Sequence, residues 1–422
     1  MAVGLGGKVL EVVTLVPLVT VVPRVLGPGD YGAFALALSV VTIGASAAAL
    51  GGPTLMSRFV PAAPPGERPE LALALTIHSG RWRLAFALVA VLGAVTVSVA
   101  APGTLRPLPA VLVAGALALD VAATLLLQAA LALGRVGAWS LRYPLQTAVL
   151  VAAVLPLHAG WGADGALVAL PLSTLAALGF GAAVLLPRLR GVPRGATLSP
   201  QLVRFAVLQG AGGALTMITQ RGGVVAVALL GGSAAQQGFA GISIGIALAA
   251  TYAVGQLFAV ELPGLSTTAA DDLGAAEASV RRAARILAVG TGVLALGGAL
   301  VAGPLLAAAA GSAYRASGEA LGIALAAVAL APAAAAVNQL AALRLRPELR
   351  LLAVAAGAAS FVAAALVLVP AYGAEGASGA LVLGTAATVL VAGVILRPAL
   401  DALLIAGSLV SAAAVVGVAV LR

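Results

Sequence analysis

The stretch Trp161-Gly162-Ala163-Asp164-Gly165-Ala166 recurs 211 residues later as Tyr372-Gly373-Ala374-Glu375-Gly376-Ala377. Both copies contain an aromatic residue, Gly-Ala, an acidic residue and Gly-Ala, and both lie between two long apolar runs. A looser pair of similar segments occurs at 26–35 and 230–240. The nearly equal offsets of the two pairs, 211 and 204 residues, predict an internal duplication of the chain.

The apolar runs around these repeats are long enough to cross a lipid bilayer, which takes about 20 residues of helix. Of the 422 residues, 62% are hydrophobic and only 9% are charged, whereas soluble domains have about 25% charged residues. Thirteen runs qualify: 3–23, 32–55, 80–101, 107–132, 141–159, 163–187, 203–230, 236–261, 283–309, 318–343, 349–370, 375–396 and 399–421. The composition therefore predicts an all-α polytopic membrane protein.

The duplication divides these runs into two sets of six. Because six is an even number, both sets cross the membrane in the same orientation, as parallel repeats. The predicted architecture is two six-helix lobes, residues 1–190 and 203–397, with a substrate path between them. Residues 398–422 would add a thirteenth transmembrane helix.

The basic residues are distributed unevenly among the loops between these runs. Odd-numbered loops hold only Arg24, Arg106 and Arg315, whereas even-numbered loops hold 17 basic residues. These are Arg58, Arg68, Arg81, Arg83, Arg135, Arg142, Arg188, Arg190, Arg194, Arg204, Arg281, Arg282, Arg285, Arg344, Arg346, Arg350 and Arg397. Cytoplasmic loops carry the excess of Arg and Lys, so the N-terminus is predicted to be cytoplasmic. The ratio of 22 Arg to one Lys indicates a GC-rich bacterial gene and hence the bacterial cytoplasmic (inner) membrane.

The sequence excludes several kinds of chemistry. The chain has no Cys, and therefore no disulfide, thiolate nucleophile or Cys-based metal site. The stretch at 4–9 lacks the spacing of a phosphate-binding loop, and His78 and His158 lack metal-ligand spacing. The basic residues are scattered between apolar runs rather than gathered on a nucleic-acid-binding face. We therefore expect a transporter and not an enzyme, with no cofactor, metal or nucleic acid.

Charged side chains within membrane spans are costly, so each is a candidate functional residue. Arg221 lies well inside the seventh run, next to Gln220. Asp120 lies in the middle of the fourth run, and Thr124 and Gln128 follow it at helical spacing. This spacing predicts a polar stripe that faces the protein interior. Arg221 would point about 100° away from Gln220 and towards a different surface.

Two interpretations of these residues stay open. In the first, Arg221 attracts an anionic substrate together with Arg24 and Arg58 at the mouths of a path, because a guanidinium binds phosphate oxygens bidentately. In the second, Arg221 and Asp120 pair and fix the helix packing. The candidate substrate-binding residues are Arg221, Arg24, Arg58, Asp120 and Gln220.

The segment Pro23–Leu36, with Arg24, Leu26-Gly27-Pro28 and Tyr31-Gly32, resembles the first loop of the polysaccharide flippases. Residues 261–266 and 311–315 are also similar to that family. The family belongs to the multidrug, oligosaccharidyl-lipid and polysaccharide exporter superfamily. The resemblance implies two six-helix lobes around a cavity, which agrees with the repeat. Relatives usually have 12 or 14 spans, so a thirteenth would be a departure.

The resemblance also implies a function. A flippase of this family would move an undecaprenyl-pyrophosphate-linked oligosaccharide from the cytoplasmic to the outer leaflet, for cell-surface polysaccharide biosynthesis. Its partners would be that substrate and membrane lipids, and the coupling ion, H⁺ or Na⁺, stays open. One alternative is a cation-coupled multidrug antiporter, which needs a carboxylate such as Asp120 or Glu11. Another is a noncatalytic membrane scaffold.

Overall fold

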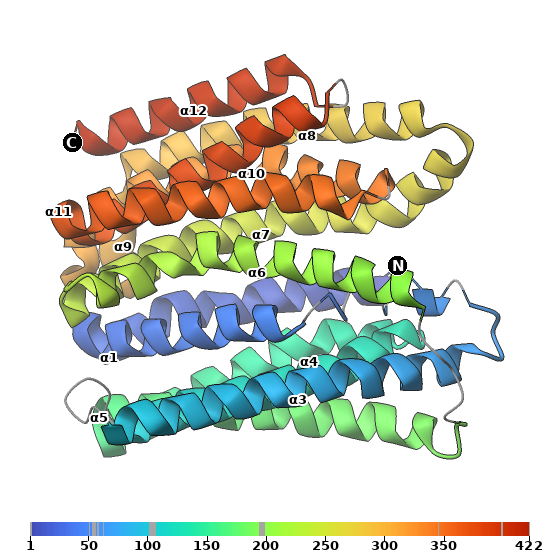
Figure 1. Cartoon of the computed structure of the whole chain (residues 1–422). Helices are drawn as coiled ribbons and strands as arrows, with labels where there is room; N and C mark the ends of the chain where they lie inside the picture. Colours follow the sequence, from blue (N-terminus) through green and yellow to red (C-terminus); the bar gives the residue numbers. More distant parts are fainter. Residues whose placement is uncertain are drawn as a thin grey trace. The chain divides into compact units, whose positions relative to one another are not determined.

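The structure, a computed structural model, describes residues 2–49, 51–52, 56, 59–61, 63–100, 107–193, 199–344, 346–397 and 400–421. All regular elements in these ranges are helical (Figure 1). They are α1 (Ala2–Ala49), α3 (Arg68–Ala100), α4 (Pro107–Ala132), α5 (Val136–Leu189), α6 (Pro200–Leu229), α7 (Ala234–Asp271), α8 (Leu273–Leu300), α9 (Ala302–Ala310), the 3₁₀ helix η1 (Ser312–Ser317), α10 (Gly318–Leu343), α11 (Pro347–Ile395) and α12 (Ala402–Val420). Within the described residues, nine helical stretches are long and apolar enough to cross a membrane. The prediction of an all-α polytopic membrane protein is confirmed.

The number of helices differs from the prediction. The described ranges contain 12 helices, and a thirteenth is not seen as a separate helix. The reason is that α1, α5 and α11 each contain two predicted runs, joined at Gly27, Gly162 and Gly373. These glycines have φ values of 70°, 60° and 54°, which a residue without a Cβ adopts readily. The last apolar run forms α12.

The two copies of the six-residue repeat have the same local geometry. Gly162 and Gly373 both break their helix, with ψ values of −143° and −119°. A Cβ at Gly165 would lie 2.0 Å from the Leu157 carbonyl oxygen, and a Cβ at Gly376 would lie 2.2 Å from that of Leu368. The first glycine of each copy thus breaks the helix, and the second lies against a backbone carbonyl oxygen. This shared geometry supports the inferred duplication.

The chain folds into two compact units. Unit 1 comprises Met1–Leu26 and Ala37–Ala214, and unit 2 comprises Gly27–Leu36 and Leu215–Arg422. The units are defined by internal contacts alone. The predicted lobe boundaries at 1–190, 203–397 and 398–422 therefore stay a prediction.

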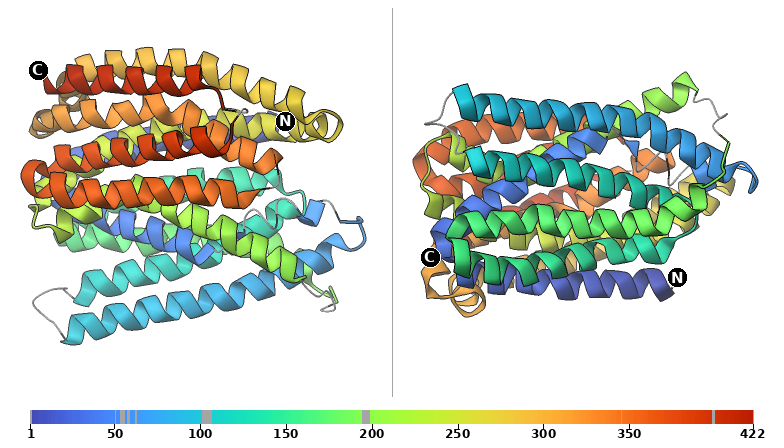
Figure 2. Two further views of the ribbon diagram at one scale, coloured as in Figure 1. Left: turned by 45° about the horizontal axis from the view of Figure 1, so that its top comes forward. Right: turned by 90° about the horizontal axis from the view of Figure 1, so that it is seen from below.

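In unit 1, α4 packs along α5 and α3 packs along α4. Their ends enclose a core of small and aliphatic side chains, which includes Met56, Leu75, Ala129 and Leu185. In unit 2, α10 is almost wholly buried and contacts α7, α8, α11 and α12. Figures 1 and 2 both show α12 alongside α8 and α10. The Ala-rich sequence of α10 permits its contacts with four neighbouring helices, because small side chains let helices approach closely.

The resemblance to the flippase first loop lies at a tight crossing of α1 and α7 within unit 2. A Cβ at Gly32 would lie 1.9 Å from the Ala234 carbonyl oxygen, and one at Gly238 would lie 2.1 Å from the Pro28 carbonyl oxygen. The backbones meet where any larger residue would collide. Gly32 and Gly238 belong to the looser pair of repeated segments, so these two segments contact each other within unit 2.

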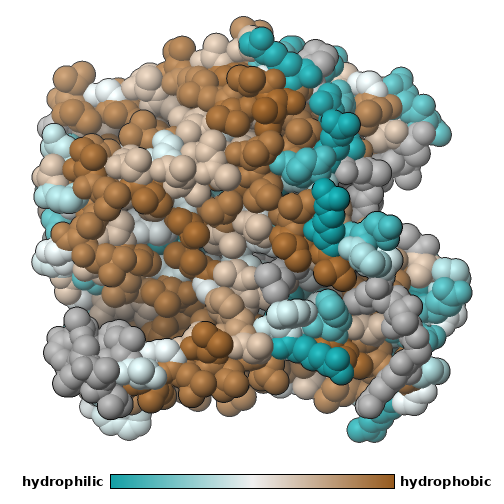
Figure 3. Space-filling view, in the orientation of Figure 1, coloured by the Kyte–Doolittle hydropathy of each residue, from teal (hydrophilic) through white to brown (hydrophobic). Residues whose placement is uncertain are grey.

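Large apolar side chains cover the outward flanks of the helices. On α8, Ile286, Val289, Val293 and Leu294 are each at least 66% exposed. Figure 3 shows hydrophobic surface along the lengths of the helices and hydrophilic surface mainly at helix ends. Such extensive apolar exposure is expected of a surface that faces lipid rather than water.

Candidate functional site

Unit 1 contains an ion pair between two transmembrane helices. The Arg142 guanidinium on α5 lies 3.0 Å from the Asp120 carboxylate on α4 and also donates to the Thr124 hydroxyl. The Gln146 amide donates to the same Asp120 oxygen at 3.2 Å. Arg142 also lies over the Tyr143 ring, 4.6 Å from its centroid. Asp120 is therefore held by a cation and an amide in the interior of unit 1.

A second buried guanidinium lies nearby. Arg83 on α3 is 2% exposed and donates to the carbonyl oxygen of Ala49 and the Gln128 side-chain oxygen, each at 3.1 Å. Its Nε has no hydrogen-bond partner among the described residues. Arg83 also interacts electrostatically with Arg142 and Asp120. We refer to these three residues as the Arg83–Asp120–Arg142 cluster.

The cluster corrects two sequence-based placements. Arg83 and Arg142 were assigned to loops, yet they lie within α3 and α5. The two helices begin at Arg68 and Val136, well before the apolar runs at 80 and 141, so a guanidinium near the start of a run is already inside a helix. A hydropathy profile counts the charge of such an arginine, but it contains no information about the partners from other helices that allow the arginine to be buried.

The predicted polar stripe on α4 is confirmed. Asp120 and Thr124 both contact Arg142, and Gln128 contacts Arg83. One face of α4 thus carries the partners of both buried guanidiniums. With two guanidiniums and one carboxylate, the cluster has a net charge of +1.

In unit 2, Arg221 on α6 lies within electrostatic range of Tyr31 on α1. The Tyr31 ring packs against Phe34 and, edge to face, against Tyr314, which also contacts Phe239. No carboxylate in the described part of unit 2 forms an ion pair with Arg221. The guanidinium therefore lies beside an aromatic cluster.

Gln220 lies on a different side of α6. Together with Thr216 and Thr219 it lines a cavity of about 310 Å³ within unit 2. The facing wall includes Asn338 on α10 and Thr388 on α11. No charged residue lines this cavity, which is a pocket of hydroxyl and amide groups among apolar side chains. The expected divergence of Gln220 and Arg221 is thus observed, because only Gln220 lines the pocket.

The remaining sequence candidates are less informative. Arg24 lies exposed on α1, and Arg58 lies outside the described residues. The side chain of Glu11, the second candidate carboxylate, is also outside the description. Within the described ranges, no group of three or more His, Asp or Glu residues could hold a metal ion. Arg83 and Arg142 were not among the candidate site residues predicted from the sequence. Apolar residues flank both arginines along their helices, and this pattern could have indicated that the two side chains are buried.

Ion pairs also fix helix ends in unit 2. The Arg344 guanidinium donates to both carboxylate oxygens of Glu277, at 2.6 and 3.3 Å. Arg285 on α8 pairs with Asp401, whose carboxylate accepts from the Leu404 N–H and caps α12. Partial burial raises the pKa of Asp401, but the Leu404 N–H and the Arg285 guanidinium outweigh it and hold that pKa below its ordinary value.

No protein-family model and no curated protein matches the sequence. The structure, however, is similar to solved transporters along most of its length. An inward-facing multidrug resistance MATE family transporter of the MOP superfamily superposes with a TM-score of 0.63 at 16% identity, covering 91% of this chain and 94% of that chain. The fold is similar to that of this MOP superfamily transporter.

Two further structures extend the comparison. The lipid II flippase MurJ, in an inward closed conformation, has a TM-score of 0.60 at 11% identity and covers 90% of this chain and 87% of its own. A MOP superfamily transporter from Pyrococcus furiosus, reported to have a binding pocket of reverse polarity, has a TM-score of 0.55 at 14% identity, with coverages of 94% and 92%. The fold of this chain is thus similar to that of a multidrug transporter and to that of a lipid flippase.

Proposed function

We propose that the protein is a flippase that moves an undecaprenyl-pyrophosphate-linked oligosaccharide from the cytoplasmic to the outer leaflet of the bacterial inner membrane. The product would serve cell-surface polysaccharide biosynthesis. The candidate anion-binding residue is Arg221, with Arg24 and Arg58 nearer the membrane surfaces. The energy source and the identity of the sugar are left open by this proposal.

The proposal is supported by the excess of positive charge in membrane-spanning helices. Arg221 in unit 2 and the net charge of the Arg83–Asp120–Arg142 cluster in unit 1 are both cationic. A cation within a membrane-spanning helix is costly and is retained where it has a function. A pyrophosphate offers oxygens on two phosphorus atoms, and guanidinium groups bind such oxygens with paired hydrogen bonds.

The single observation that carries the proposal over its rival is the state of Asp120. A cation-coupled antiporter needs a carboxylate that binds and releases H⁺ or Na⁺. Asp120 instead pairs with Arg142 at 3.0 Å and accepts from Gln146. Its carboxylate oxygens are thus already engaged by a guanidinium and an amide within unit 1.

The neutral cavity beside Gln220 supports a saccharide ligand. Sugar hydroxyls both donate and accept hydrogen bonds, and the cavity supplies hydroxyl groups from Thr216, Thr219 and Thr388 and an amide from Asn338. A pocket of mostly apolar wall with a few placed polar groups is typical of small-ligand sites. Substrate recognition would then divide between a cationic residue for the pyrophosphate and a neutral pocket for sugar.

The test is the level of lipid-linked oligosaccharide in cells that lack the protein. Wild type, Arg221→Gln and Arg282→Gln are restored at matched expression, since Arg282 is an exposed cation on α8 and serves as the control. We expect accumulation of the intermediate on the cytoplasmic face, cured by wild type and by Arg282→Gln but not by Arg221→Gln. Absence of accumulation together with increased drug sensitivity would favour the antiporter.

A further inference from the structure

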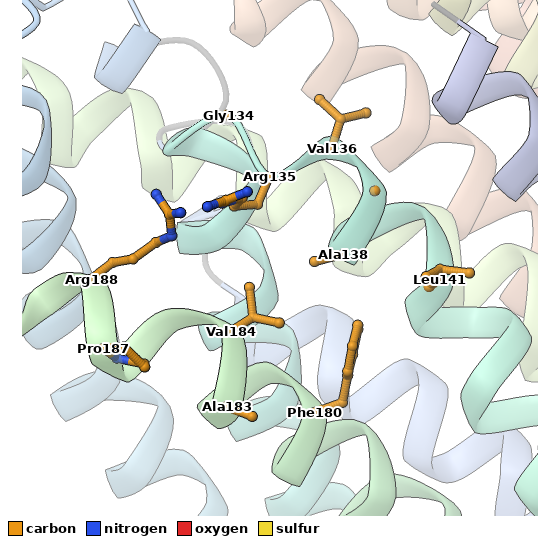
Figure 4. Close-up of a pocket in the computed structure, with 11 residues that line it drawn as sticks. Gly134, Arg135, Val136, Ala138, Leu141, Phe180, Ala183, Val184, Pro187 and Arg188 are labelled. Atoms are coloured by element: carbon orange, nitrogen blue, oxygen red, sulfur yellow. The ribbon is translucent and has the colours of Figure 1, made fainter.

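A separate hollow lies in unit 1, where the turn between α4 and α5 meets the end of α5. It has a volume of about 690 Å³ and is lined by Arg135, Arg188, Leu141, Phe180 and Val184, among others. Figure 4 shows the guanidinium groups of Arg135 and Arg188 pointing toward one another over Val184, with Phe180 and Leu141 on the apolar side. We refer to this feature as the Arg135–Arg188 hollow. None of its residues belongs to the Arg83–Asp120–Arg142 cluster.

The hollow brings two positive charges together without a negative one. No acidic residue lines it, and neither guanidinium forms an ion pair with a described residue. Two like charges at close range repel each other, and a shared anion removes the repulsion. Phosphate is the anion that suits them, because two guanidinium groups can each donate a pair of hydrogen bonds to its oxygens.

The position of Arg135 has no explanation in helix stability. Arg188 lies in the last turn of α5, where a cation interacts favourably with the helix dipole. Arg135 instead precedes the first turn of α5, where the dipole disfavours a cation, and it provides no side-chain cap. The first-turn residues Val136 and Gly137 also line the hollow, so uncapped N–H groups add to its attraction for an anion.

The opposite wall of the hollow is apolar and continues onto the lipid-facing surface. Phe180 and Val184 form the wall, and Leu141 and Val136 at its edge are 43% and 45% exposed. A free phosphate ion would leave this wall bare. A phospholipid would cover it with an acyl chain while its phosphate binds the guanidiniums.

We propose that the Arg135–Arg188 hollow binds an anionic phospholipid of the leaflet that faces the predicted cytoplasm. Arg135 and Arg188 bind the phosphate, and Phe180, Val184 and Leu141 contact the acyl chain. The site is a lipid-binding site on unit 1 and does not depend on the proposed flippase substrate. Its occupancy would make stability or transport sensitive to the anionic lipid content of the membrane.

The experiment is a lipid titration of the purified full chain in neutral detergent, read by native mass spectrometry. The probes are phosphatidylglycerol, phosphatidylcholine and inorganic phosphate. The variants are Arg135→Gln with Arg188→Gln, and Phe180→Ala alone; Arg282→Gln with Arg346→Gln is the charge-matched control in unit 2. Thermal unfolding of each variant checks that it is folded, and Arg135→Lys with Arg188→Lys retains the charges if the glutamine variant fails to fold.

We expect wild type to retain phosphatidylglycerol in preference to phosphatidylcholine. Each guanidinium removed should weaken that binding about fivefold, and Phe180→Ala should weaken binding of the lipid but not of phosphate. The control pair should bind as wild type does. Equal retention of the two lipids by wild type, or unchanged binding after both arginines are replaced, would overturn the proposal. So would phosphate displacing the lipid at equal concentration, since the apolar wall would then contribute nothing.

Discussion

Arg83 is the most deeply buried charged side chain among the described residues. If its guanidinium were removed, two acceptors would lose their hydrogen-bond donor. Arg83→Met keeps much of the side-chain length but leaves the Gln128 oxygen and the Ala49 carbonyl without their donor. We expect a loss of about 1–3 kcal/mol in the free energy of unfolding, the usual cost of an unsatisfied buried acceptor. Urea or thermal unfolding in detergent measures it.

The control is the double variant Arg83→Met with Gln128→Leu. Removing both partners takes away one of the unsatisfied acceptors, so the double variant should lose less than the sum of the two single variants. Strictly additive losses would mean that the 3.1 Å hydrogen bond between Arg83 and Gln128 contributes no coupling.

Asp401 provides a prediction about pH. Its pKa in the folded protein lies below the ordinary value of 3.8, so its ion pair with Arg285 stabilises the fold above that ordinary value. The contribution is lost as the pH falls through the lower pKa of the folded state. Because Arg285 is half exposed, we expect wild type to exceed Arg285→Gln by at most about 1 kcal/mol at neutral pH.

Unfolding of wild type and Arg285→Gln between pH 7 and pH 2 checks this expectation. The difference should shrink towards zero at the acid end and should also shrink in high salt, which screens exposed pairs. A difference that is independent of both pH and salt would assign the effect of the substitution to packing.

At the scale of the elements, the breaks in α5 and α11 differ in one respect. Nothing lies within 4 Å of a Cβ added at Gly162, whereas a Cβ at Gly373 would lie 2.6 Å from the Gln236 side-chain oxygen. That oxygen accepts a hydrogen bond from the Ala374 N–H at 2.8 Å, so Gln236 of α7 fixes the break in α11. The two glycines share a backbone conformation and differ in their surroundings.

We therefore expect Gly373→Ala to destabilise more than Gly162→Ala. Strained backbone conformations cost about 1–3 kcal/mol at either position, and displacement of Gln236 adds to this at Gly373 alone. Gly407→Ala, in the middle of α12 with nothing near its Cβ, should be neutral or slightly stabilising. Thermal unfolding of the three variants gives the order. Equal losses at Gly373 and Gly162 would show that Gln236 does not restrain the break.

Across the whole molecule, the elements were more predictable than their connections. The length and apolarity of the runs predict the helices, and the repeat at Trp161 and Tyr372 predicts matching breaks. Hydropathy could not predict how the two runs of α5 and of α11 are joined, because Gly162 and Gly373 leave the helical backbone conformation and separate two helical segments on either side. The thirteen predicted runs therefore do not match the labelled helices one to one, because α1, α5 and α11 each contain two runs separated by a non-helical glycine.

The candidate site was predictable in part. The spacing of Asp120, Thr124 and Gln128 predicts their common face, since a helix has 3.6 residues per turn. Their partners Arg83 and Arg142 come from other helices, and contacts between distant segments leave no local pattern. The role of Arg221 in substrate binding stays a prediction.

The central claim is that the protein moves an anionic lipid-linked saccharide, and reconstituted transport tests it most directly. Purified protein is placed in liposomes with an undecaprenyl-pyrophosphate-linked saccharide, and transfer between leaflets is followed with a glycan-modifying enzyme that cannot cross the membrane. Wild type and Arg282→Gln should transfer the substrate, and Arg221→Gln should be about tenfold slower, as expected from loss of one charge-assisted contact. Lack of transfer by wild type, or equal transfer of a saccharide on an uncharged lipid, would contradict the claim.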